Sequence, residues 1–109
     1  MGDSENSHAV LVVEDEPMIR IMAVDHLQEA GFEVHEAARA DEAIPILEAH
    51  SEIQLLFADV KMPGSMDGLK LAQYVQRRWP GVKIIVTSGH VRVTEDGLPS
   101  GALFLPKPL

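Results

Sequence analysis

Three carboxylates, one hydroxyl and one ammonium group stand at the ends of apolar runs in this sequence. They belong to Glu14, Asp15, Asp59, Ser88 and Lys107. Apolar runs rich in β-branched residues are typical of strands that are buried on both faces of a parallel sheet. Because ligands in such sheets bind at the carboxyl ends of the strands, we expect the five groups to converge on one edge.

Carboxylates that converge repel one another unless a cation or a proton neutralises them. Mg²⁺ (or Mn²⁺) takes oxygen ligands, so we predict that Asp15 and Asp59 bind the ion directly and Glu14 directly or through water. A free oxygen of Asp59 could then attack phosphorus, because aspartate is a covalent acceptor of phosphoryl groups. The metal and Lys107 would stabilise the charged phosphoryl oxygens, and Ser88 would donate to a third.

The elements that must position these groups alternate along the chain. Strands are predicted over residues 9–13, 32–37, 53–58, 82–87 and 102–105. Helices are predicted over residues 17–30 and 67–79, and another follows Asp41, which is expected to cap it, with Pro45 suited only to its first turn. Residues 91–101 contain glycine and proline, so a helix there would be short or frayed. The alternation predicts right-handed crossovers and a small doubly wound α/β domain.

The first helix is predicted to turn one apolar stripe toward the sheet. The stripe comprises Ile19, Met22, Ala23, His26, Leu27 and Ala30. His26 is therefore interpreted as a packed histidine. His35, His50 and His90 show no ligand spacing along the chain, so no catalytic histidine is predicted.

Composition bounds the remaining function classes. The chain has 109 residues, the size of one domain, and its net charge of −8 argues against direct binding of nucleic acid. Disulfides and thiolate sites are excluded because there is no cysteine. No apolar run reaches the roughly 20 residues of a membrane span. Residues 1–8 are polar, so we expect a short flexible lead-in and a cytoplasmic location.

The chain resembles a response-regulator receiver domain of bacterial two-component signalling over residues 9–109. The matching features are Glu14-Asp15, Asp59 in D-V-K-M-P-G, Gly68 in M-D-G, Ser88-Gly89 and Lys107-Pro108. The resemblance implies a flavodoxin-like fold, a five-stranded parallel sheet of order 2-1-3-4-5. It also implies that Asp59 accepts a phosphoryl group from a histidine kinase or a phosphotransfer protein.

The resemblance assigns further roles around Asp59. The backbone carbonyl of Lys61 would be a metal ligand, and Phe104 would be the aromatic side chain that rotates when the domain switches. Gly89 would leave room for the phosphodonor. Ser88 is preferred over Thr87 as the phosphoryl-binding hydroxyl because of its spacing from Asp59, and Thr87 remains the alternative.

The site residues and the resemblance are compatible with three classes of function. The first is a signalling module with no separate substrate to turn over, whose phosphorylation changes binding to an unknown downstream protein. The second is an aspartate-nucleophile phosphohydrolase, which usually needs a second acid two residues after the nucleophile, where this chain has Lys61. The third binds partners without phosphorylation, and Asp15, Asp59 and Lys107 argue against it.

The sequence differs from the pattern of the family at two further places. Ser65 adds a residue to the loop after Asp59. The sequence ends at Leu109, where the family places a fifth helix, so the domain at 9–109 is expected to lack that helix. Without that helix, apolar surface on the sheet would be exposed to water. We therefore expect a truncated chain, swapped packing, or a dimer that forms through the sheet face or the switch face.

Overall fold

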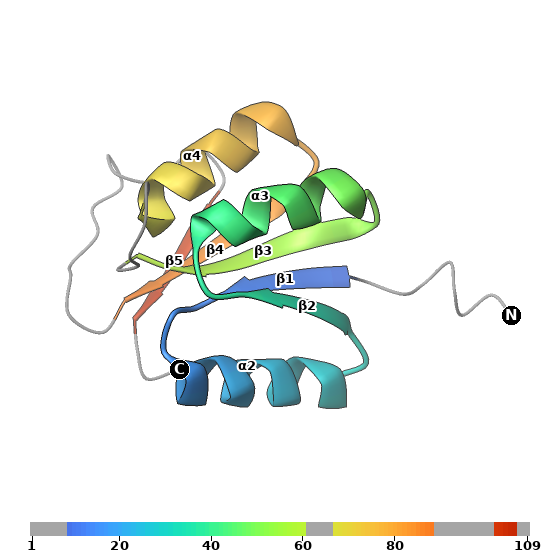
Figure 1. Cartoon of the computed structure of the whole chain (residues 1–109), viewed down its shortest axis with the longest axis vertical. Coiled ribbons are helices and arrows are strands. Elements are labelled where there is room, and N and C mark those ends of the chain that lie inside the picture. Colours follow the sequence, from blue (N-terminus) through green and yellow to red (C-terminus); the bar gives the residue numbers. More distant parts are fainter. Residues whose placement is uncertain (1–8, 61–66, 89–101, 107–109) are drawn as a thin grey trace, which may run out of the picture.

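The computed structural model describes residues 9–60, 67–88 and 102–106, and it contains one parallel sheet of five strands (Figure 1). The strands are β1 (Ala9–Val13), β2 (Glu33–Ala37), β3 (Ile53–Asp59), β4 (Lys83–Ser88) and β5 (Leu103–Pro106). Their order in the sheet is β2-β1-β3-β4-β5, and every neighbouring pair is parallel. The doubly wound, flavodoxin-like order that the resemblance implied is therefore confirmed.

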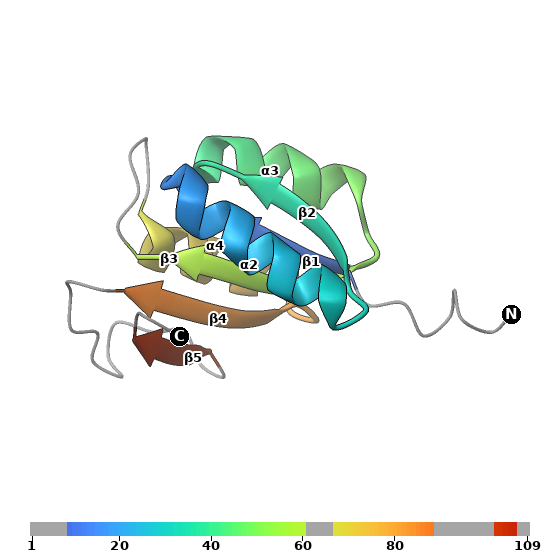
Figure 2. The ribbon, with the colours of Figure 1, turned by 90° about the horizontal axis from the view of Figure 1, so that it is seen from below.

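Three helices cover the two faces of the sheet within the described residues. They are α2 (Pro17–Glu29), α3 (Ala40–Ala49) and α4 (Gly68–Arg78). Helix α2 lies on one face, and α3 and α4 lie side by side on the other (Figures 1 and 2). None of these helices is long and apolar enough to cross a lipid bilayer.

Strand β1 forms the centre of the core because its side chains are buried on both faces. All five of its residues are at most 1% exposed. Leu11 and Val13 join Leu56 in the larger cluster, which packs under α3 and α4. Val10 and Val12 join Val24 of α2 in the smaller cluster on the other face. A continuous apolar run is the pattern expected for such a strand.

Helix α2 presents only part of the predicted stripe to the sheet, namely Ala23 and Leu27. Its buried residue is Val24, and Ala23 and Leu27 pack beside it in partly buried positions. Ile19 and Met22 are exposed, as are His26 and Ala30, so the interpretation of His26 as a packed histidine is wrong. Only a narrow strip of the helix contacts the sheet, and the regular spacing of apolar residues continues onto the exposed side.

The start of α3 also differs from its prediction. Arg39 occupies the N-cap position without a side-chain cap, and Asp41 lies in the first turn. The carboxylate of Glu42 instead accepts a hydrogen bond from the Ala38 backbone N–H at 2.8 Å. Pro45 stands inside the helix, beyond its first turn. Burial of Ala43 and Leu47 against the sheet offsets the cost of this interior proline.

Helix α4 begins where the chain returns to the end of β3. Asp67 caps it by accepting a hydrogen bond from the Lys70 backbone N–H at 2.9 Å. The Gly68 N–H donates to the Val60 carbonyl at 2.9 Å. A Cβ added at Gly68 would overlap the backbone carbonyl group of Asp59. Glycine at this position therefore lets the helix start pack directly against the residue that ends β3.

We expect Gly68→Ala to lower the free energy of unfolding by about 1–3 kcal/mol, because the added methyl group has no room beside the Asp59 backbone. Urea denaturation measures the change. Gly81→Ala is the matched control, since a Cβ at Gly81 meets nothing within 4 Å. A loss for Gly68→Ala no larger than that for Gly81→Ala would show that the close approach does not constrain the fold.

Candidate functional site

The carboxylates of Glu14, Asp15 and Asp59 come together at the carboxyl end of the sheet. Strands β1 and β3 are neighbours in register, with Val13 beside Ala58, so the chain leaves both strands at the same edge. One carboxylate oxygen from each of the three residues lies within 4.8 Å of the others. The structure thus brings together the three acids that the sequence placed at strand ends.

Two of these three carboxylates are buried. Glu14 is 4% exposed and Asp59 is 7% exposed, whereas Asp15 is exposed to solvent. Burying like charges together is costly unless a cation or a proton compensates them. Three oxygen donors with one side open to water suit a hard divalent cation that keeps several waters, such as Mg²⁺. The residues present therefore fit a magnesium site.

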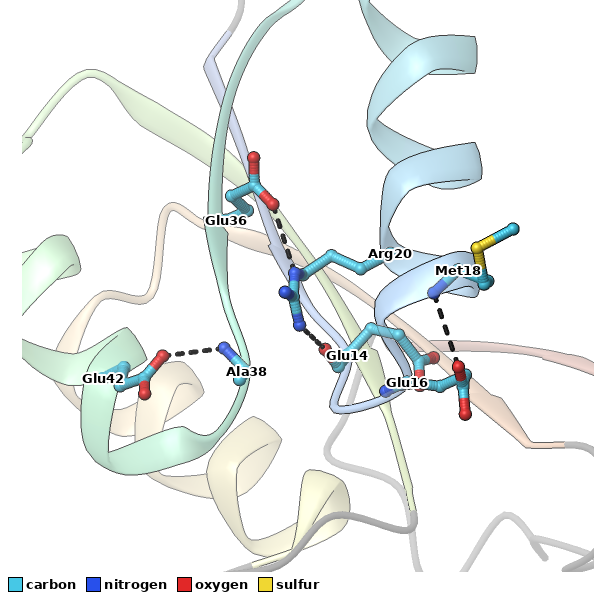
Figure 3. A network of polar contacts seen from close by, with 7 residues as sticks. All are labelled: Glu14, Glu16, Met18, Arg20, Glu36, Ala38 and Glu42. Carbon is cyan, nitrogen blue, oxygen red and sulfur yellow. Dashed lines mark hydrogen bonds and ion pairs between the residues drawn. The ribbon is translucent and has the colours of Figure 1, made fainter.

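The loop that carries Glu14 is held by a network of hydrogen bonds (Figure 3). The Glu14 N–H donates to the Ala37 carbonyl at 3.0 Å, which ties the loop to the end of β2. The Glu16 N–H donates to Oε2 of Glu14 at 3.0 Å and fixes the side chain. The first contact positions the Glu14 backbone, and the second sets the direction of its carboxylate.

Arg20 completes this network from the first turns of α2. Its Nη1 donates to the backbone carbonyl of Glu14 at 2.8 Å, and its Nε donates to Oε1 of Glu36 at 3.1 Å (Figure 3). One guanidinium therefore joins the loop after β1 to β2. Sequence reasoning missed Arg20, because its partner Glu36 is 16 residues away and no local pattern links them.

The hydroxyl group near Asp59 has two candidates in β4. Asp59 is the register partner of Thr87, and the Val60 N–H donates to the Thr87 carbonyl at 2.8 Å. Thr87 is 1% exposed, so its side chain is enclosed. Ser88 is the last residue of β4, one position nearer the edge of the sheet. The structure gives no description of the Ser88 side chain, so the choice between the two hydroxyls stays a prediction.

The remaining predicted site residues are described only in part. Phe104 lies on β5 beside Val86 of β4, and its half-buried ring packs against the larger core cluster. Lys61, Gly89 and Lys107 lie outside the described residues, as do Ser65 and the short helix expected within 91–101. Their roles remain predictions.

Comparison with known proteins agrees with this arrangement. The family model for the response regulator receiver domain matches residues 10–109. Sensor kinase CckA from Brucella abortus is 40% identical over 97% of this chain, which spans 12% of the length of that relative. The crystal structure of the receiver domain from hybrid histidine kinase CckA has a TM-score of 0.78 and 36% identity, covering 93% of this chain and 86% of that one.

A second solved structure was determined with ligands. Response regulator TrrA from Thermotoga maritima, crystallised in complex with Mg²⁺ and BeF, has a TM-score of 0.78 and 27% identity. The similarity covers 92% of this chain and 86% of that one. The match of the family model over nearly the whole chain, on the sheet order and acidic edge described above, leads to one conclusion. This chain belongs to the response regulator receiver family, whose domains take part in two-component phosphorelay signalling.

Proposed function

We propose that Asp59 accepts a phosphoryl group from a histidine kinase or a phosphotransfer protein. The observation that carries this proposal is the cluster of Glu14, Asp15 and Asp59 at the carboxyl end of the central strands. Asp59 ends β3 and is held in place by its own strand and by the approach of Gly68. A carboxylate fixed in this way is a suitable nucleophile for phosphorus.

Magnesium binding is part of the proposal. Glu14, Asp15, Asp59 and the backbone carbonyl of Lys61 would hold Mg²⁺ or Mn²⁺. When bound, the cation supplies positive charge against the phosphoryl oxygens and offsets the repulsion among the carboxylates. The donor set of three clustered carboxylates supports this assignment. The neighbour TrrA, crystallised with Mg²⁺ and BeF, supports it by analogy.

Asp59, Ser88 and Lys107 would each have a separate role in the phosphoryl transfer. One oxygen of Asp59 forms a bond to phosphorus as the bond from phosphorus to the donor's histidine nitrogen breaks. Ser88 would donate a hydrogen bond to a phosphoryl oxygen, and Lys107 would pair with its charge. Ser88 suits this role better than Thr87, because Thr87 is enclosed within the sheet.

After phosphorylation, the hydroxyl residue would move toward the phosphoryl group, and the ring of Phe104 would then rotate. Phe104 lies on β5, which β4 separates from β3, and its half-buried ring has an exposed side to move toward. Gly89, the small residue after Ser88, would leave space for the phosphodonor. The phosphorylated domain would then bind a downstream protein differently from the unphosphorylated one.

The phosphohydrolase alternative is less well supported. An aspartate nucleophile of that class needs an acid two residues later to protonate the leaving group and activate water. Lys61 occupies that position in this chain. A phosphoryl group on Asp59 would therefore persist longer than an enzymatic intermediate, as a signal requires.

Incubation with acetyl phosphate and Mg²⁺ tests the proposal through intact mass. We expect one phosphoryl group per chain, dependent on Mg²⁺ and absent in Asp59→Asn, because Asp59 is the proposed acceptor. Asp25→Asn is the matched control, since Asp25 lies exposed on α2 outside the cluster. An adduct that survives in Asp59→Asn would contradict the assignment. Rapid release of many equivalents of phosphate per chain would favour the phosphohydrolase.

Arg20→Lys tests whether the network behind Glu14 positions the metal site. Lysine keeps the positive charge but cannot donate to Glu14 and Glu36 with a rigid fork. We expect Mg²⁺ affinity to fall roughly tenfold, as is usual when groups that orient metal ligands are lost. Titration calorimetry measures the affinity. Arg77→Lys on the exposed end of α4 is the control, and an equal affinity for both variants would exclude a positioning role for Arg20.

Self-association remains a proposal that the exposed apolar side chains support. Met18, Ile21 and Met22 of α2 are 66%, 51% and 56% exposed, and Leu103 of β5 is 60% exposed. The part of the sheet around β4 and β5 carries no described helix on the α2 side (Figure 2). A second copy of the chain would cover the exposed apolar side chains of α2.

We expect light scattering to show a concentration-dependent dimer. Met22→Glu should weaken that dimer, because it places a charge in the apolar surface. Gln28→Glu, which adds the same charge elsewhere on the exposed side of α2, is the control. A monodisperse monomer at every concentration would rule out the dimer through this face.

A further inference from the structure

A second cluster of metal-ligating side chains lies away from the acidic site. His35 belongs to β2, His50 follows the last turn of α3, and Glu52 lies in the turn that leads into β3. One ligand atom from each residue lies within 4.8 Å of the others. The cluster stands beside the amino end of β3, whereas Asp59 ends the same strand. The two clusters are therefore separate.

The distances within this cluster are close to those of a metal site. Oε2 of Glu52 lies 3.2 Å from Nδ1 of His50 and 3.7 Å from Nε2 of His35. Zinc binds nitrogen and oxygen at about 2.0–2.2 Å in a tetrahedron, which places neighbouring ligand atoms roughly 3.3–3.6 Å apart. The two rings lie against each other, with centroids 4.3 Å apart and planes tilted by 35°, and one ligand atom of each lies within 4.8 Å of the other. Small rotations of the two more exposed side chains would complete the arrangement.

One nitrogen of this cluster lacks a hydrogen bond. Nε2 of His35 is buried and has no hydrogen-bond partner among the described residues. Oε2 of Glu33 lies 3.2 Å away, within the distance of an ion pair but outside hydrogen-bond geometry. A buried polar atom without a partner is uncommon in folded proteins and costs stability. A cation at this point would accept the lone pair of a neutral imidazole.

The charge around the two rings favours a cation. Glu52 and Glu33 both approach His35, and no Lys or Arg side chain pairs with either carboxylate in the described part of the chain. The Glu52 carboxylate is 49% exposed and is available as an anionic ligand.

We propose that His35, His50 and Glu52 bind a zinc ion, with water in the fourth position. Two imidazoles and one carboxylate form a donor set that zinc accepts with an open site, whereas Mg²⁺ prefers oxygen ligands alone. The His35 side chain is 19% exposed and its Nε2 is buried, whereas the His50 side chain is 41% exposed, so an ion would approach from the His50 side. The bound ion would join β2 to the end of α3 and the start of β3.

Titration calorimetry with ZnCl₂ tests this site. The experiment uses the full chain carrying Asp15→Asn and Asp59→Asn, which removes ligands from the acidic cluster. We expect one equivalent of Zn²⁺ to bind, excess Mg²⁺ not to compete, and the melting temperature to rise with Zn²⁺ concentration. His50→Ala and Glu52→Gln should each weaken binding at least tenfold, whereas His26→Ala, at an exposed histidine on α2, should not.

Several results would overturn the proposal. The first is that the chain carrying only Asp15→Asn and Asp59→Asn does not bind zinc. The second is that His50→Ala and Glu52→Gln both leave the zinc affinity unchanged. The third is that His26→Ala lowers the affinity as much as they do. His50 and Glu52 are substantially exposed, so both variants should keep the urea midpoint of the parent without zinc. Loss of binding accompanied by loss of the folded state in both variants would also count against a defined metal site. None of these outcomes depends on whether Asp59 accepts phosphate.

Discussion

Electrostatic repulsion between two buried carboxylates is the constraint on which the functional end of this domain depends. Glu14 and Asp59 leave neighbouring strands at the same edge and are almost fully enclosed, and Asp15 adds a third acid beside them. Water cannot screen charges in such a position, so the arrangement is favourable only when a cation or a proton shares it. The cluster therefore fits a divalent ion, and the proposed phosphoryl transfer to Asp59 would depend on that ion.

The rest of the fold holds these charges in place. Strand β1 is buried on both faces and delivers Glu14 to the edge, while α4 begins so close to β3 that only glycine fits beside the Asp59 backbone. Arg20 joins the loop of Glu14 to Glu36 of β2 without contributing a ligand. Rigid support of this kind matters because metal ligands that repel one another would otherwise rotate apart. The contacts that stabilise the fold at this end of the sheet, at Gly68 and Arg20, therefore also position the acidic cluster.

Sequence reasoning recovered the features that local pattern encodes. The apolar runs predicted strands β1 and β3 within a residue of their ends, and the strand ends predicted where the acids meet. Long-range pairing was not accessible: Arg20 finds Glu36 across 16 residues, and His35, His50 and Glu52 come from three elements with no shared spacing. The exposed side of α2 and the cap of α3 were missed because apolar spacing and an aspartate near a helix start do not reveal which surface packs or which carboxylate bonds.

Beryllofluoride, a mimic of a phosphoryl group on a carboxylate, offers the most direct measurement of the central claim. Fluorine NMR of the protein with beryllofluoride should show bound fluoride signals only when Mg²⁺ is present. Asp59→Asn should abolish these signals while the urea midpoint without Mg²⁺ stays at or above that of the parent chain, because the change removes one of the charges that repel one another. Bound signals without Mg²⁺, bound signals in Asp59→Asn, or none in the parent chain would contradict the account of Asp59 as a metal-assisted phosphoryl acceptor.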